Sequence, residues 1–157
     1  MKKLILAILL AFPFVAMSQT YTAGYSSKFA MADPSFSEKV LTLWKDYENN
    51  TLDNHADLIA DTVTMILQQG AVVKGRTENL KGAKDFRASI KDYKVGIDAW
   101  MSVKSLDKNE NIVLVWGFEN YTDKDGKQVK ARVHEVWVFN KAGKISLMMQ
   151  FSGAGGM

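Results

Sequence analysis

The C-terminal half of the chain limits its possible folds most strongly. Four long segments with the composition of strands follow one another at 95–106, 111–122, 127–140 and 144–152. A short turn signal separates each from the next: Asp107-Lys108-Asn109, Asp125-Gly126 and Ala142-Gly143. Because strands joined by tight turns pair antiparallel, these segments predict one antiparallel meander.

The segments before this meander have a helical period. Ser35 is followed three residues later by Glu38, which is the pattern of a capping box. Apolar residues then recur at helical spacing up to Asn49-Asn50, with Trp44 beside them: Phe36, Val40, Leu43 and Tyr47. The pattern predicts one amphipathic helix whose apolar stripe faces the sheet.

Shorter elements complete the order. A second helix fits 53–60, two short strands fit 62–67 and 71–73, and a third helix fits 82–93. The helices must cover one face of the sheet, since both kinds of element have an apolar side to bury. We therefore expect an α+β fold in one domain.

The Asp125-Gly126 turn predicts which side chains face the helices. A two-residue loop places Trp116 opposite Glu135, and a four-residue loop leaves the faces unchanged. The bulkier face, which we expect to be the core side, holds one ionisable residue, Glu135. Its members are Ile112, Leu114, Trp116, Phe118, Val129, Ala131, Val133, Glu135, Trp137 and Phe139. The opposite face, which includes Glu119 and Arg132, would be the outer one, and its valines make it a plausible surface for a homodimer.

The first residues have the pattern of a secretion signal. Met1-Lys2-Lys3 precede an uncharged apolar run to Val15, and small residues then allow cleavage before Gln19. We expect an exported protein, periplasmic or secreted. The expected regions are a signal peptide at 1–18, a linker or loosely docked arm at 19–34, the domain at 35–152 and a flexible tail at 153–157.

Composition argues against several classes of function. Removal of two lysines with the signal leaves 18 basic against 17 acidic residues, which gives little reason to expect binding to nucleic acid or to a membrane. The chain has no cysteine, so thiolate metal sites and cysteine nucleophiles are excluded. His55 and His134 have no third metal ligand at a useful spacing. We predict no metal and no cofactor.

Three stretches resemble the nuclear transport factor 2-like superfamily, including its SnoaL-like and ketosteroid isomerase-like members. They are Ile59–Thr64, Leu80–Phe86 and 126–145, and the last resembles two strands of ketosteroid isomerase. The resemblance covers about residues 36–152. It implies a cone-shaped, curved antiparallel sheet covered on its concave face by three helices.

The same resemblance suggests roles for single residues. Glu135 falls where the isomerases keep an acid that donates a hydrogen bond to the developing oxyanion. Their general base would fall at Leu67, which cannot move a proton. Their oxyanion-hole tyrosine would fall near Trp44 or Lys45, with Tyr47 one turn away. Steroid isomerisation by the family mechanism is therefore not expected.

Glu135 has three interpretations from the sequence. It could line a pocket as an acid, pair structurally with an indole N–H or with Tyr47, or lie at a wet sheet edge. The first hypothesis for function is a domain that binds a small, mostly apolar ligand. Its site would be lined by Trp44, Tyr47, Leu67, Trp116, Glu135 and Trp137.

Two other hypotheses stay open. One is an enzyme of the isomerase, dehydratase or hydrolase type, with Glu135 as its catalytic acid–base residue. It needs a second polar group in the cavity, which Tyr47 or Gln150 would supply by pointing inward. The other is a protein-binding module that uses the outer sheet face.

Overall fold

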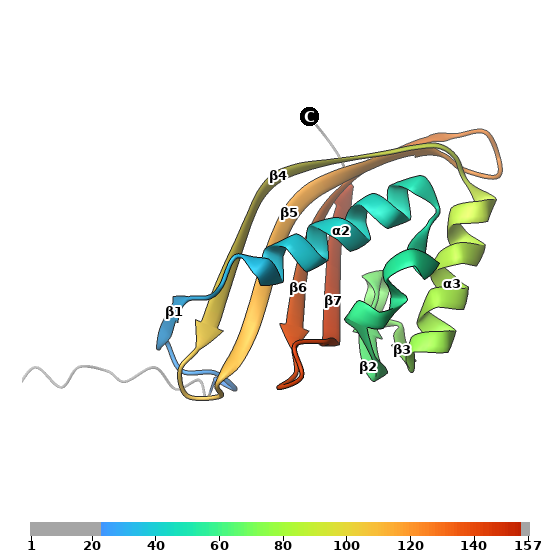
Figure 1. Ribbon diagram of the computed structural model, residues 1–157. Helices are drawn as coiled ribbons and strands as arrows, with labels where there is room; N and C mark the ends of the chain where they lie inside the picture. The colour runs from blue at the N-terminus through green and yellow to red at the C-terminus, as the bar shows by residue number, and fades with distance from the viewer. Residues whose placement is uncertain (1–22, 155–157) are drawn as a thin grey trace, which may run out of the picture.

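A curved sheet forms the frame of the computed structural model, which describes residues 23–154. In this part of the chain the sheet has seven strands in the order β1-β4-β5-β6-β7-β2-β3 (Figure 1). They are β1 (Phe29–Met31), β2 (Ile59–Ile66), β3 (Val72–Lys74), β4 (Lys91–Ser105), β5 (Glu110–Thr122), β6 (Gln128–Phe139) and β7 (Ile145–Ala154).

The helical elements lie on the concave side of this sheet. Figure 1 shows α2 (Ser35–Asn49) running along the hollow of the sheet and α3 (Arg76–Ser89) beside it at one end. Between them lies the 3₁₀ helix η1 (Leu52–Leu58), and η2 (Gln68–Gly70) joins β2 to β3. The predicted fold class is confirmed. Neighbouring strands pair antiparallel except β2 and β7, which pair parallel.

Asp33 caps α2, so the predicted capping box is wrong. The Oδ1 atom of Asp33 accepts a hydrogen bond from the N–H of Ser35 at 2.8 Å, and its carbonyl accepts one from Phe36 at 3.2 Å. Pro34 already has helical dihedral angles, φ −57° and ψ −25°. Helical backbone angles therefore begin one residue before α2, at Pro34, and the side chain of Ser35 does not occupy a capping position.

The third helix begins and ends earlier than predicted. It starts at Arg76, because Gly75 has a φ of +87° that ends the preceding strand. The side-chain amide of Asn79 donates to the carbonyls of Val73 and Gly75, which fastens the first turn. At the other end, residues after Ser89 enter β4, so Tyr93 lies on a strand.

The hairpin between β5 and β6 has three loop residues, so the predicted register is wrong. The N–H of Asp123 donates to the carbonyl of Lys127, and the N–H of Gly126 donates to the carbonyl of Asp123. Gly126 has a φ of +81°, as such a loop requires. An odd loop length shifts the pairing by one residue.

This shift reverses the faces of β5 but not those of β6. Glu135 pairs with Val115, and Trp116 pairs with His134. Val113 and Val115 are fully buried under the helices, whereas Trp116 is 36% exposed on the outer face. The concave face of β5 therefore carries Val113, Val115, Gly117, Glu119 and Tyr121.

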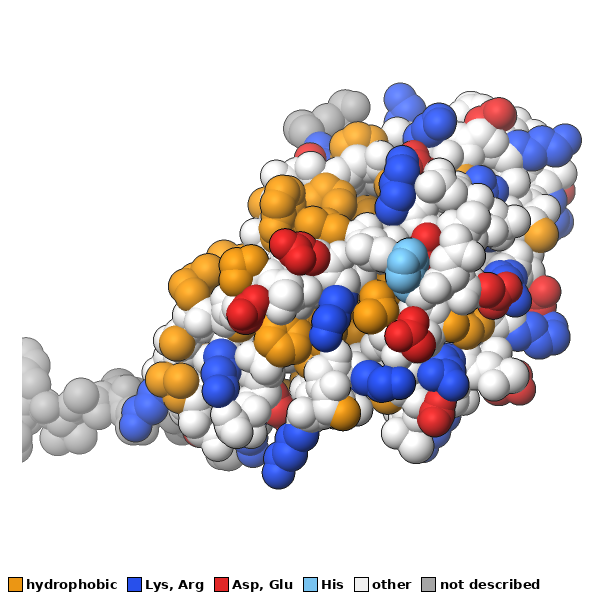
Figure 2. All heavy atoms as spheres, in the orientation of Figure 1, with side chains coloured by type: hydrophobic (Ala, Val, Ile, Leu, Met, Phe, Trp, Pro, Cys, Tyr) orange, Lys and Arg blue, Asp and Glu red, His pale blue; other side chains and the backbone are white. Residues whose placement is uncertain are grey.

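The segment before α2 is fastened to the far edge of the sheet. Phe29 pairs with Ser105 through β1, and the hydroxyl of Tyr25 donates to Glu110 at 2.7 Å. Figure 2 shows apolar side chains gathered over β1 and the adjoining part of β4. In this region Met31 and Trp100 are among the exposed apolar residues.

The predicted signal peptide, its cleavage site and most of the predicted tail fall outside the described residues. They stay predictions, as does export. Within 23–154, no helix combines the length and the apolar character needed to cross a membrane.

Gly117 lets α2 approach the sheet. A Cβ atom at this position would lie 2.4 Å from the backbone oxygen of Gly96 and 3.1 Å from the indole ring of Trp44. Neither neighbour can move freely, because one is backbone and the other is a buried side chain. The absence of a side chain at Gly117 therefore sets the position of Trp44.

We expect Gly117→Ala to destabilise the fold by about 2 kcal/mol, because it overpacks this contact. The measurement is urea unfolding of both proteins. Gly82→Ala is the matched control, since Gly82 lies inside α3 with open space around it. That change should instead stabilise by about 0.5–1 kcal/mol. Equal effects of the two substitutions would contradict the tight contact.

Candidate functional site

Glu135 lies at a junction between three elements. Its Oε2 atom accepts hydrogen bonds from the indole Nε1 of Trp44 on α2, at 2.7 Å, and from that of Trp137 on β6, at 2.9 Å. Its Oε1 atom accepts one from Nε2 of Gln150 on β7, at 2.9 Å. The residue is 5% exposed. The interpretation of Glu135 as a partner of indole N–H groups agrees with this geometry, and a wet sheet edge does not.

The carboxyl of Glu135 has a higher pKa in this environment than an exposed glutamate has in water. Burial raises the pKa of this carboxyl to about 7, while the three hydrogen bonds act to lower it. The carboxyl of Glu119 adds a smaller contribution in the upward direction. Near neutral pH, Glu135 therefore exists in both protonation states.

Glu119 is a second buried acid, which sequence reasoning placed on the outer face. It is 8% exposed, and its Oε1 atom accepts a hydrogen bond from the hydroxyl of Tyr93 at 2.6 Å. Burial raises its pKa, and the bond from Tyr93 lowers it. Among the described side chains, Tyr93 is its one hydrogen-bond donor. The carboxyl of Glu119 can therefore form a further hydrogen bond.

Three phenol rings stand beside these acids. The ring of Tyr47 packs edge-on against that of Tyr93, with centroids 5.2 Å apart, and Tyr121 lies 6.2 Å beyond Tyr93. Burial and the nearby charges of Glu119 and Glu135 raise the pKa of Tyr47. Tyr47 therefore stays a neutral hydrogen-bond donor.

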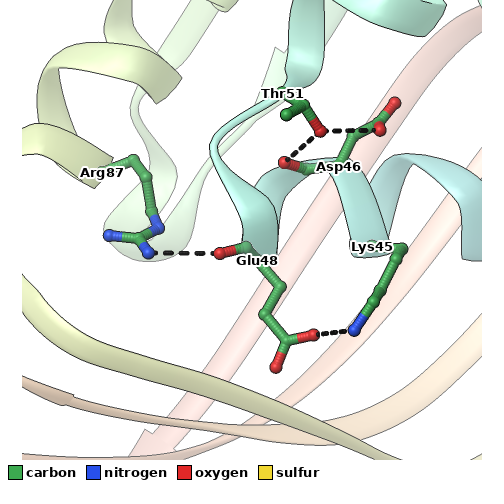
Figure 3. Close-up of polar contacts among 5 residues, drawn as sticks. All are labelled: Lys45, Asp46, Glu48, Thr51 and Arg87. Atoms are coloured by element: carbon green, nitrogen blue, oxygen red, sulfur yellow. Dashed lines mark hydrogen bonds and ion pairs between the residues drawn. The ribbon is translucent and has the colours of Figure 1, made fainter.

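Polar contacts fix the end of α2 that carries Trp44 and Tyr47. Figure 3 shows Arg87 of α3 reaching the backbone of this end, where its Nη2 atom donates to the carbonyl of Glu48 at 3.1 Å. Thr51 donates to the carboxylate of Asp46 at 2.9 Å. Lys45 and Glu48 form an ion pair at 2.6 Å on the surface.

Arg87 also touches the interior of the site. Its guanidinium group lies 5.1 Å from the centre of the Tyr93 ring. Its Nε atom is buried and has no partner among the described residues. Arg87 therefore connects the end of α2 to the phenol that holds Glu119.

A hollow of about 510 Å³ opens near the turn between β5 and β6 and the end of β7, and neither Glu119 nor any predicted site residue lines it. Ala131, in its wall, is the cross-strand partner of Glu119, and Tyr121, also in its wall, lies two residues along the same strand. The remaining wall residues are Gln68, Lys127, Gln128, Val129, Lys130, Ser152 and Gly153. This volume suits a small organic molecule.

The structure gathers most of the predicted site residues. Trp44, Tyr47, Glu135 and Trp137 face the concave side, and Leu67 packs against the same core. Trp116 is the exception: it lies on the outer face because the hairpin has an odd number of loop residues.

Glu119 and Tyr93 were not among the residues predicted for the site. The sequence from Asp123 to Lys127 contains a signal for the register of β5, which places Glu119 on the concave face. A glycine at its fourth position and an aspartate at its first favour a three-residue loop. Within residues 23–154, no group of three or more His, Asp or Glu side chains is arranged to hold a metal ion.

Comparisons with known proteins bear on the fold. No family model and no curated protein matches the chain. Solved structures do, and they include an NTF2-like protein of unknown function from Cytophaga hutchinsonii, at 12% identity and a TM-score of 0.55. The alignment covers 75% of this chain and 99% of that one. This chain has the nuclear transport factor 2-like fold.

Other structures with this fold carry names of enzymes. An LEH-like epoxide hydrolase from M. tuberculosis has a TM-score of 0.62 at 13% identity, with 75% of this chain and 82% of that one covered. A SnoaL-like polyketide cyclase, named as putative, from Jannaschia sp. CCS1 has a TM-score of 0.60 at 12% identity, with 76% and 86% covered. At such identities the likeness concerns the fold alone.

The raised pKa of Glu135 makes stability depend on pH. The unfolded carboxyl has a pKa near 4.5 and the folded one about 7, so the folded state binds the proton more tightly. The resulting stabilisation is fully present below pH 4.5 and is lost as the pH rises to 7. Between these pH values, the free energy of unfolding of the wild type should fall by about 3 kcal/mol more than that of Glu135→Gln.

Urea unfolding at a series of pH values measures this difference. Gln suits the comparison because its amide keeps the shape of the carboxyl and can still accept the two indole hydrogen bonds. Parallel stability curves for the two proteins would show that the pKa of Glu135 is not raised.

Proposed function

We propose that the concave site binds a small, mostly apolar molecule, and that Glu119 is its polar anchor. The observation that supports this proposal is a buried carboxyl with one hydrogen-bond donor, whose cross-strand partner Ala131 lines a hollow of about 510 Å³. Binding sites for small molecules usually combine apolar walls with few polar groups, each of which fixes one atom of the ligand.

Three residues have different roles in this proposal. Glu119 keeps its proton to a higher pH than an exposed glutamate, so it donates a hydrogen bond to an oxygen atom of the ligand. Tyr93 orients Glu119. Glu135 is a positioning residue, because its three hydrogen bonds hold Trp44, Trp137 and Gln150 in place where α2, β6 and β7 meet.

Acid–base catalysis is the second candidate function. Gln150 points inward and Tyr47 lies beside both acids, which supplies the additional polar groups that an enzyme needs. The reaction would be an isomerisation, dehydration or hydrolysis in which a carboxyl moves a proton. Glu119 suits that role better than the predicted Glu135, whose oxygens already accept three hydrogen bonds.

Thermal unfolding against a panel of small ketones, alcohols and epoxides tests the binding proposal. A ligand at 100 times its dissociation constant stabilises the folded state by about 2.7 kcal/mol. Wild-type binding should weaken as the pH rises through the raised pKa of Glu119, since the deprotonated carboxyl cannot donate. Glu119→Gln should bind without this pH dependence, because its amide donates at every pH.

Two further variants complete the experiment. Glu119→Leu should lose binding altogether, whereas Glu78→Gln, at an exposed position of α3, should behave as wild type. The proposal fails if no compound stabilises the wild type, or if hits bind Glu119→Leu unchanged. Turnover of a hit by wild type but not by Glu119→Gln would favour the enzyme.

A further inference from the structure

The hollow of about 510 Å³ near the turn between β5 and β6 carries positive charge. Lys127 and Lys130 line it, and no acidic residue does. Neither lysine forms an ion pair with the described part of the chain, whereas Lys124, in the same turn, pairs with Asp125. A hollow lined by charges of one sign concentrates ligands of the opposite sign.

Neutral hydrogen-bond donors line the same hollow. They are the hydroxyls of Tyr121 and Ser152 and the side-chain amide of Gln68. None of these three side chains forms a hydrogen bond with the described residues. Burial and the nearby carboxyls of Glu119 and Asp123 raise the pKa of Tyr121, so its hydroxyl keeps its proton and donates. Together with the ammonium groups, these donors favour a ligand group that only accepts hydrogen bonds.

The two carboxyls near Tyr121 do not neutralise the lysines. The Oδ1 atom of Asp123 accepts hydrogen bonds from the N–H groups of Asp125, at 3.0 Å, and of Lys127, at 2.9 Å, which hold it in the turn. Glu119 is bonded to Tyr93, and burial raises its pKa. Neither carboxyl lines the hollow.

An apolar strip completes the lining. Tyr121 and Val129 are cross-strand partners, and Ala131 follows two residues along β6, so the three side chains share one face of the sheet. Lys127 precedes β6 and Lys130 lies on the other face of that strand, so the ammonium groups border this strip without interrupting it. The volume exceeds that of a carboxylate or phosphate group alone and lies within the range of about 300–1,000 Å³ that is typical of small-molecule sites.

We propose that the ligand is an amphipathic anion, whose apolar part lies on the strip and whose anionic oxygen group binds Lys127 and Lys130. This inference rests on the proposed function and narrows the class of its ligand. A carboxylate and a phosphate monoester share the required chemistry, because both present negatively charged oxygens that accept hydrogen bonds from lysine.

Isothermal titration of the full-length protein with octanoate, octyl phosphate and octanamide tests the inference. Octanamide has the chain and nearly the shape of octanoate but no charge. At least one of the two anions should bind the wild type about tenfold more tightly than octanamide does, and the stronger anion identifies the head group. This preference should shrink between about 20 mM and about 500 mM NaCl, since salt screens exposed charges.

Variants locate the charge that produces the preference. Lys127→Gln and Lys130→Gln should each reduce it about threefold, because an ion pair of an exposed lysine contributes modestly, and the double variant should abolish it. Affinity for octanamide should stay the same in all of them. Lys124→Gln is the matched control, since it removes the same charge from the same turn at a residue that does not line the hollow. It should keep the preference of the wild type.

The outcomes separate this inference from the proposed function. Equal affinities for octanamide and both anions, no binding of either anion, or equal losses of preference in Lys124→Gln and Lys127→Gln would each overturn the anionic ligand. The proposed function fails separately, through hits that bind Glu119→Leu unchanged. Loss of octanamide and anion binding together in Glu119→Leu, with the preference lost only in the lysine variants, would support both.

Discussion

The carboxyl group of Glu135 accepts hydrogen bonds from Trp44 on α2, Trp137 on β6 and Gln150 on β7, between the helix and the sheet. Burial of a carboxyl and of two indole N–H groups would be costly without these bonds, so each group depends on the others. The junction fixes α2 against the sheet where Gly117 leaves room for an indole ring. Tyr47, one turn further along α2, is thereby placed beside Tyr93 and the second acid, Glu119.

Much of the fold follows from the sequence because its signals are periodic. The apolar stripe of α2 and the four long strands give the layers of the structure without knowledge of tertiary contacts. The faces of β5 do not follow, because they depend on whether the hairpin loop has an even or an odd number of residues. Asp123 and Gly126 favour a loop of three residues. The resulting shift of one residue places Trp116 on the outer face and Glu119 on the concave face.

The same distinction applies to the site. Glu135, Trp44 and Trp137 could be predicted together, since two lie on one face of β6 and the third on the apolar stripe of α2. Glu119 required the register of β5, which the loop from Asp123 to Lys127 sets, and Tyr93 required the true end of α3, where the chain enters β4 and pairs with β5. The shift also placed a row of aromatic rings on the outer face, where the sequence had suggested a valine-rich surface.

Two carboxyl groups on the concave face hold their protons more tightly than ordinary glutamates do. Carbon-13 NMR of the glutamate side chains, titrated from pH 3 to 9 and assigned with Glu119→Gln and Glu135→Gln, measures this directly. We expect the carboxyl of Glu135 to titrate near 7 and that of Glu119 above the ordinary value of 4.5. Titration of both carboxyls near 4.5 would contradict these raised pKa values.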